Sequence, residues 1–196
     1  MSIPKKVLSD REASPTAWRH AVWLALLVAA SVAFSLGFSC AVPFAAFGAV
    51  AALTLERRDA LMLIGGIWLA NQLVGFGFLD YPWTADTFVW GIVLGAVAIL
   101  CTIAARSAVD RFEGRDTIIA ALAAFTAAFV VYEGSLFVVS ATLLGRLEDF
   151  VPAIVARILE INAAAFVGLL ILNRLGKAAG FASGPAARLS AGERHA

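Results

Sequence analysis

Nearly every Lys and Arg of this chain lies in alternate gaps between long apolar runs, and this pattern constrains the fold more than any other feature. Hydrophobic residues make up 61% of the 196 residues. A run of about 20 apolar residues can cross a bilayer as a helix, because a helix satisfies its own backbone hydrogen bonds. The pattern therefore predicts an all-α, polytopic membrane protein whose helices form one bundle.

Six apolar runs are candidates for transmembrane helices, and their spacing also predicts an orientation. We expect the spans at residues 17–36, 41–55, 60–79, 87–105, 117–144 and 150–172. The N-terminal segment together with Arg19 at the start of the first span, the gaps after the second and fourth spans, and the C-terminal tail hold 13 of the 15 basic residues. Basic residues concentrate on the cytoplasmic side of membrane proteins, so both termini are predicted to be cytoplasmic.

This topology divides the chain into a polar cytoplasmic segment (1–16), a six-helix transmembrane domain (17–173) and a disordered cytoplasmic tail (174–196). The loops are too short for an extramembrane domain, and the sequence has no motif for binding nucleotides or for zinc or serine hydrolysis. We expect a transporter or a membrane subunit in the inner (plasma) membrane, with the lipid bilayer as its surroundings and no cofactor of its own. Nucleic acid is not an expected partner.

Cys40 is the first candidate site residue, because a lone thiol is unusual on the oxidising side of a membrane. The second span has 15 residues, about 22 Å of helix, and is expected to begin below the outer surface. Cys40 and Pro43 would then line an outward-facing cavity, with Cys40 either a ligand-binding thiol or a buried, inert one. Cys101 is expected to be a core residue.

Polar and aromatic residues flank the outer end of the third span. Tyr81 and Trp83 lie in the loop that follows it and serve either as interfacial anchors or as a lid over a ligand. Asn71 and Gln72 interrupt the span itself. Adjacent residues point to different faces of a helix, so at most one of these amides is expected to face a cavity, while the other bonds to a neighbouring helix.

Three ionisable residues, Glu133, Arg157 and Glu160, fall inside the fifth and sixth spans. An ionised group in hydrocarbon costs on the order of 3 kcal/mol, so each must face protein or water. Arg157 and Glu160 are spaced to pair along one helix face. The three residues form either an ion-pair cluster between these spans or polar contacts to a ligand.

Ala21, Ala25 and Ala29 recur at every fourth position of the first span and form a ridge bordered by Trp18 and Leu36. Small residues at this spacing allow another helix to pack closely. The ridge is therefore a candidate surface for a partner protein.

Six spans, cytoplasmic termini, an alanine ridge and an outer cavity resemble the substrate-binding (S) component of an energy-coupling factor transporter. Within that group, the stretches Phe38–Phe44, Trp68–Gln72, Gly75–Gly77 and Tyr81–Thr84 are similar to the BtuM-like cobalamin transporter family. The resemblance implies that cobalamin binds in the outward cavity as a substrate, with a cysteine coordinating its cobalt and promoting loss of the upper cyanide ligand.

Cys40 is the cysteine placed for this role, and the resemblance makes it both the metal ligand and the reactive residue. Phe44, Tyr81 and Trp83 would contact the corrin, and Asn71 or Gln72 its amide rim. Transport would occur either by this chain alone or by docking of the alanine ridge on a transmembrane coupling subunit with separate ATPases. Two alternatives stay open. One is a carrier for another small solute bound by Glu133, Arg157 and Glu160, and the other is a non-transporting accessory subunit of a membrane complex.

Overall fold

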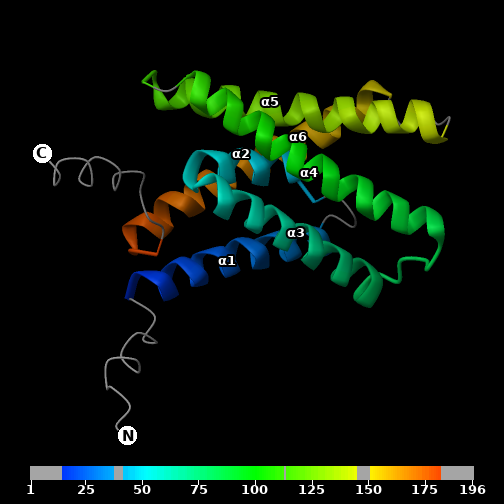
Figure 1. Ribbon diagram of the computed structural model, residues 1–196, viewed down its shortest axis with the longest axis horizontal. Coiled ribbons are helices and arrows are strands. Elements are labelled where there is room, and N and C mark those ends of the chain that lie inside the picture. Colours follow the sequence, from blue (N-terminus) through cyan, green and yellow to red (C-terminus); the bar gives the residue numbers. More distant parts are fainter. Residues whose placement is uncertain (1–14, 38–41, 113, 145–150, 182–196) are drawn as a thin grey trace, which may run out of the picture.

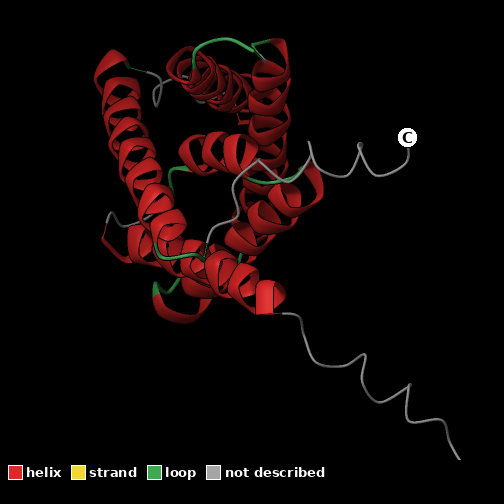
Figure 2. Ribbon diagram, turned by 90° about the vertical axis from the view of Figure 1, so that its left-hand side faces the viewer, coloured by secondary structure: helices red, strands yellow, loops and turns green. Residues whose placement is uncertain are grey.

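The computed structural model describes residues 15–37, 42–112, 114–144 and 151–181. Every regular element in these ranges is helical (Figure 2), so the predicted all-α class is confirmed for this part of the chain. The elements are α1 (Pro15–Gly37), α2 (Phe44–Thr54), α3 (Arg57–Phe78), α4 (Ala85–Arg111), α5 (Thr117–Val139), its π-helical extension η3 (Ser140–Leu144) and α6 (Pro152–Ala178).

Five of these helices, α1, α3, α4, α5 and α6, are long and apolar enough to cross a membrane, which is the architecture of a multi-pass membrane protein. The second predicted span differs. Its helix α2 has 11 residues, about 16 Å of helix, against a hydrocarbon core of about 30 Å. The sequence analysis expected a short second span of 15 residues, and the helix in the structure is shorter still, so the count of six spans is not confirmed.

Two predicted segments at the chain ends fall largely outside the described residues. These are 1–14 of the polar N-terminal segment and 182–196 of the tail. The tail was expected to begin at 174, but α6 continues to Ala178. The sequence there, Asn173 to Ala178, still permits a helix, since it contains no proline and its lone glycine is tolerated.

Successive helices run in opposite directions along the bundle, so alternate helix ends meet (Figure 1). Trp18 near the start of α1 lies against Phe181 after α6, with ring centroids 6.1 Å apart. Arg106 near the end of α4 donates a hydrogen bond to the carbonyl of Leu55, which follows α2. The start of α1 and the ends of α2, α4 and α6 therefore lie at one end of the bundle.

We call this end the basic end, because eight of the nine described Lys and Arg residues lie at or near it: Arg19, Arg57, Arg58, Arg106, Arg111, Arg115, Arg174 and Lys177. The ninth is Arg157. At the opposite end, the loop before α4 carries Asp80, and the first turn of α4 carries Asp86. The described basic residues thus gather at one end of the bundle, as the positive-inside pattern predicts for one face of a membrane protein.

The short helix α2 is the centre of the bundle. Every residue from Phe44 to Ala52 is buried, and α2 contacts α3, α4, α5 and α6. A helix that is hydrophobic on all sides has to be enclosed. Gly48 lets α2 approach α4 closely, since a Cβ at this position would lie 3.0 Å from Oγ1 of Thr102 in α4.

The first turn of α2 begins inside the protein, and its backbone needs hydrogen-bond partners there. Asn162 of α6 supplies one, because its Oδ1 accepts a hydrogen bond of 3.2 Å from the N–H of Ala46. Its Nδ2 donates to the carbonyl of Ile158 at 3.0 Å, which fixes the orientation of the amide. Asn162 is 2% exposed, so this link between α6 and α2 is shielded from competing donors.

Two glycines of α4 allow α3 to pack closely against it. A Cβ on Gly91 would lie 2.7 Å from Oε1 of Gln72, and a Cβ on Gly95 would lie 2.8 Å from Nε1 of Trp68. The freed space admits a hydrogen bond of 2.7 Å from Trp68 Nε1 to the carbonyl of Gly91. Glycines four residues apart commonly serve this purpose between membrane helices.

Candidate functional site

Cys40, the residue on which the predicted cobalt site depends, lies outside the described residues. The chain is described again from Val42, and both Val42 and Pro43 are buried. Phe44, in the first turn of α2, is 2% exposed and belongs to the hydrophobic core. Its ring therefore packs within the bundle and offers little surface to a ligand.

Asn71 and Gln72 point to different helices, as helical geometry predicts. Oδ1 of Asn71 accepts a hydrogen bond of 3.2 Å from the hydroxyl of Ser35 in α1, and Asn71 is buried. Gln72 lies on the other side of α3, against Gly91 of α4. Asn71 thus holds α1 to α3, whereas Gln72 is half-buried.

Four aromatic side chains gather at the end opposite the basic end, and we call Phe76, Tyr81, Trp83 and Phe88 the aromatic cluster. The rings of Phe76 and Phe88 stack at 4.9 Å, and Phe76 lies 5.2 Å from Trp83 and 6.0 Å from Tyr81. The ring of Tyr81 covers Gly75, where any Cβ would collide with it. Trp83 is 76% exposed, so it presents most of its ring to the interface or to a ligand.

Glu133 of α5 is half-buried, but its Oε1 is buried without a hydrogen-bond partner among the described residues. Leaving a buried polar atom unsatisfied costs about 1–3 kcal/mol. Ionisable side chains inside membrane helices commonly mark a substrate or ion pathway. Glu133 therefore needs a donor from water, from a ligand or from a part of the chain outside the described ranges.

The ion-pair cluster considered for the fifth and sixth spans does not form within the described ranges. Arg157 and Glu160 are exposed on α6, and no ion pair joins either residue to the other or to Glu133. Arg157 lies five residues from the start of α6, about 8 Å along the helix. At that depth a long side chain can extend to the membrane interface, so its charge does not require a protein partner.

Ala21, Ala25 and Ala29 are all exposed on α1. Trp18 is 47% exposed and Leu36 is 55% exposed near the two ends of the same helix. The bundle itself therefore leaves the alanine ridge uncovered, and lipid or another helix can reach it.

Sequence reasoning missed the contacts that His20 and Asn162 make with other helices. Nε2 of His20 in α1 lies 3.0 Å from Oδ2 of Asp59 in α3, and Asn162 caps α2. The signal for Asn162 was present, since it is a lone amide within an apolar run. No local spacing links His20 to Asp59, because they are 39 residues apart.

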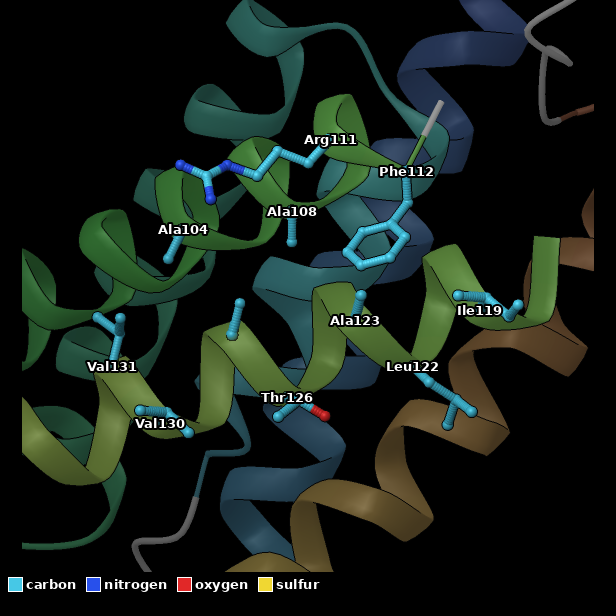
Figure 3. A pocket seen from close by; sticks show the side chains of 11 residues that line it. Ala104, Ala108, Arg111, Phe112, Ile119, Leu122, Ala123, Thr126, Val130 and Val131 are labelled. Atoms are coloured by element: carbon cyan, nitrogen blue, oxygen red, sulfur yellow. The ribbon is translucent and has the colours of Figure 1, made fainter. Parts of the chain in front are cut away.

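Two cavities are lined by described residues. One is a groove of about 670 Å³ between α4 and α5 at the basic end (Figure 3). The other, of about 100 Å³, lies between α3 and α4 and is lined by Arg57, Arg106 and Asp110 among others. Within the described ranges no three His, Cys, Asp or Glu residues are placed to hold a metal ion together.

No protein-family model matches this chain, and neither does any curated protein or solved structure. The architecture and the chemistry of individual side chains therefore carry the functional argument.

Proposed function

We propose that this chain is a membrane transporter, or the substrate-binding subunit of one, that takes up cobalamin through a site at the end opposite the basic end. The observation that supports this most is the short, buried α2. About 16 Å of helix leaves about 14 Å of the hydrocarbon thickness that α2 does not fill. The buried Pro43 and Phe44 lie at that end of α2, and Cys40 precedes Pro43 by three residues.

The chemistry proposed for Cys40 is a ligand exchange at cobalt. The thiolate sulfur forms a bond to Co(III), the cobalt–cyanide bond breaks, and cyanide leaves as an anion, so the oxidation state of cobalt does not change. Thiolates are good ligands for soft and borderline metal centres. The corrin ring brings its own nitrogen ligands, which agrees with a site that contributes one protein ligand. Whether the protein acts as an enzyme depends on whether this decyanation turns over.

The aromatic cluster and the half-buried amide of Gln72 would provide the apolar and polar contacts that small-molecule sites combine. Trp83 suits the face of the corrin, because most of its ring is exposed. Glu133 is placed on α5 as a hydrogen-bond acceptor that the described protein leaves unsatisfied. Arg157 and Glu160 are the weaker candidates, since both lie on the exposed side of α6.

We further propose that the basic end and both termini face the cytoplasm, with the chain in the inner membrane. The exposed alanine ridge of α1 would then be the docking surface for a transmembrane coupling subunit whose separate ATPases supply energy. Ala25→Leu tests this role. The variant should bind cobalamin normally but fail to associate with a coupling subunit. Loss of cobalamin binding in this variant would show instead that the ridge supports the fold.

The visible absorption spectrum of the purified protein, incubated with cyanocobalamin and washed, tests the cobalt site. Cys101 provides the matched control, because it is buried in α4 and is not proposed to touch the ligand. Wild type and Cys101→Ala should retain the corrinoid with a shifted spectrum, and Cys40→Ala should lose the shift. An unchanged spectrum in Cys40→Ala would refute cobalt coordination by this thiol.

One observation favours a second candidate, a carrier for a different small solute. Glu133 has an unsatisfied buried oxygen within a spanning helix, and such a group suits a cationic or hydrogen-bond-donating solute. If wild-type protein retains no corrinoid at all, a carrier for a different small solute replaces the cobalamin transporter as the proposed function.

A further inference from the structure

The groove between α4 and α5 is a cavity that the cobalamin proposal does not use. Its floor consists of small side chains from both helices, and Ala108 and Ala123 point toward one another across it (Figure 3). Its rim is apolar and open to the outside of the bundle, with Leu122 59% exposed and Val130 62% exposed. Because both helices are of spanning length, this opening faces the hydrocarbon of the membrane.

The length of the groove corresponds to one leaflet of a bilayer. Its lining runs along α5 from Ile119 to Val131, about 18 Å of helix. Half of a hydrocarbon core of about 30 Å is about 15 Å. An acyl chain that enters from the basic end would therefore occupy the whole length of the groove.

One residue at the interfacial end of this apolar channel carries a positive charge. Arg111 is exposed at the last residue of α4 and lines the groove, and its guanidinium extends back along α4 toward Ala104 (Figure 3). Two described carboxylates lie close to Arg111 along the chain. Asp116 accepts a hydrogen bond of 2.8 Å from the N–H of Ile118 and caps α5, and Asp110 lines the other cavity with Arg106.

We propose that this groove is a binding site for one membrane glycerophospholipid, with an acyl chain between α4 and α5 and its phosphate held by Arg111. The apolar floor matches the chain, and the guanidinium matches the phosphodiester in charge and in hydrogen-bonding geometry. Basic pockets between transmembrane helices on the cytoplasmic side are established lipid headgroup sites. The inference rests on the membrane architecture and is independent of the ligand bound near Cys40.

Native mass spectrometry of the full-length protein in mild detergent tests the site with two lipids that share acyl chains. Dioleoyl phosphatidylglycerol carries a phosphate, and dioleoylglycerol does not. Wild type should retain the phospholipid in preference. Arg111→Gln should lower phospholipid retention about fivefold, the factor expected for one basic side chain at headgroup level. Arg58→Gln is the matched control, since Arg58 is exposed at the basic end outside the groove, and it should change retention less than twofold.

A second variant, Ala123→Leu, fills the groove floor and should lower retention of both lipids. If it does not fold, Ala108→Leu makes the same test from α4. Equal retention of the two lipids by wild type, or equal losses in Arg111→Gln and Arg58→Gln, would overturn the proposal. A dimer that Ala123→Leu dissociates would also overturn it, because the occupant would then be a second copy of this chain.

Discussion

Replacing Asn162 with leucine should destabilise the bundle far more than the same change at Asn173. Both residues are buried amides on α6, 2% and 6% exposed respectively. Asn162 accepts a hydrogen bond from the N–H of Ala46, whereas Oδ1 of Asn173 has no partner among the described residues. The two substitutions are chemically identical, so their difference reports the hydrogen bonds of Asn162, of which the one to Ala46 joins α6 to α2.

The expected size of this difference follows from what each leucine leaves behind. Hydrogen bonds between membrane helices average about 0.6 kcal/mol. Asn162→Leu also leaves the N–H of Ala46, which is fully buried, without its hydrogen-bond acceptor. A stranded buried donor costs about 1–3 kcal/mol, so we expect a loss of about 2 kcal/mol. Asn173→Leu removes an unsatisfied oxygen and should be neutral or stabilising.

Thermal unfolding in detergent, followed by tryptophan fluorescence, measures both variants against wild type. For a chain of this length each kcal/mol corresponds to about 2–4 °C, so Asn162→Leu should melt about 4–8 °C below wild type. Asn173→Leu should melt at or above the wild-type temperature. Equal midpoints for the two variants would refute the reasoning, since they would show that the first turn of α2 does not depend on α6.

Two further predictions concern α3. Gly75→Ala should destabilise the protein by about 1–3 kcal/mol, because the added methyl group collides with the ring of Tyr81, and it should alter the tryptophan fluorescence of the aromatic cluster. In Gly65→Ala, in the same helix, the added methyl group meets no atom within 4 Å, so this variant should be about 0.5–1 kcal/mol more stable than wild type. A shift of the unfolding midpoint in the same direction for both glycine variants would contradict the predicted clash with Tyr81. Trp68→Phe removes the hydrogen bond to Gly91 and should lower stability by about 1 kcal/mol in the same assay; an unchanged midpoint would mean that ring packing alone holds α3 against α4.

The sequence predicted the helical class and the start of each helix within three residues, whereas α4 and α6 end six residues beyond their predicted spans. Both predictions depend on local properties. Apolar runs of spanning length can only be helices or barrel strands in a membrane, and the clustering of basic residues at one end follows directly from their positions along the chain. The different directions of Asn71 and Gln72 were also predictable, since helical geometry alone separates adjacent residues.

The tertiary structure shows which of these runs form helices long enough to cross a membrane and which polar residues contact one another. Residues 41–55 look like a short span in isolation, but burial on every side from Phe44 to Ala52 makes α2 a core helix. The partners His20 and Asp59, and Asn162 and Ala46, are 39 and 116 residues apart. Composition and periodicity report on neighbours along the chain, whereas these contacts depend on how the helices pack, and packing is a property of the whole bundle.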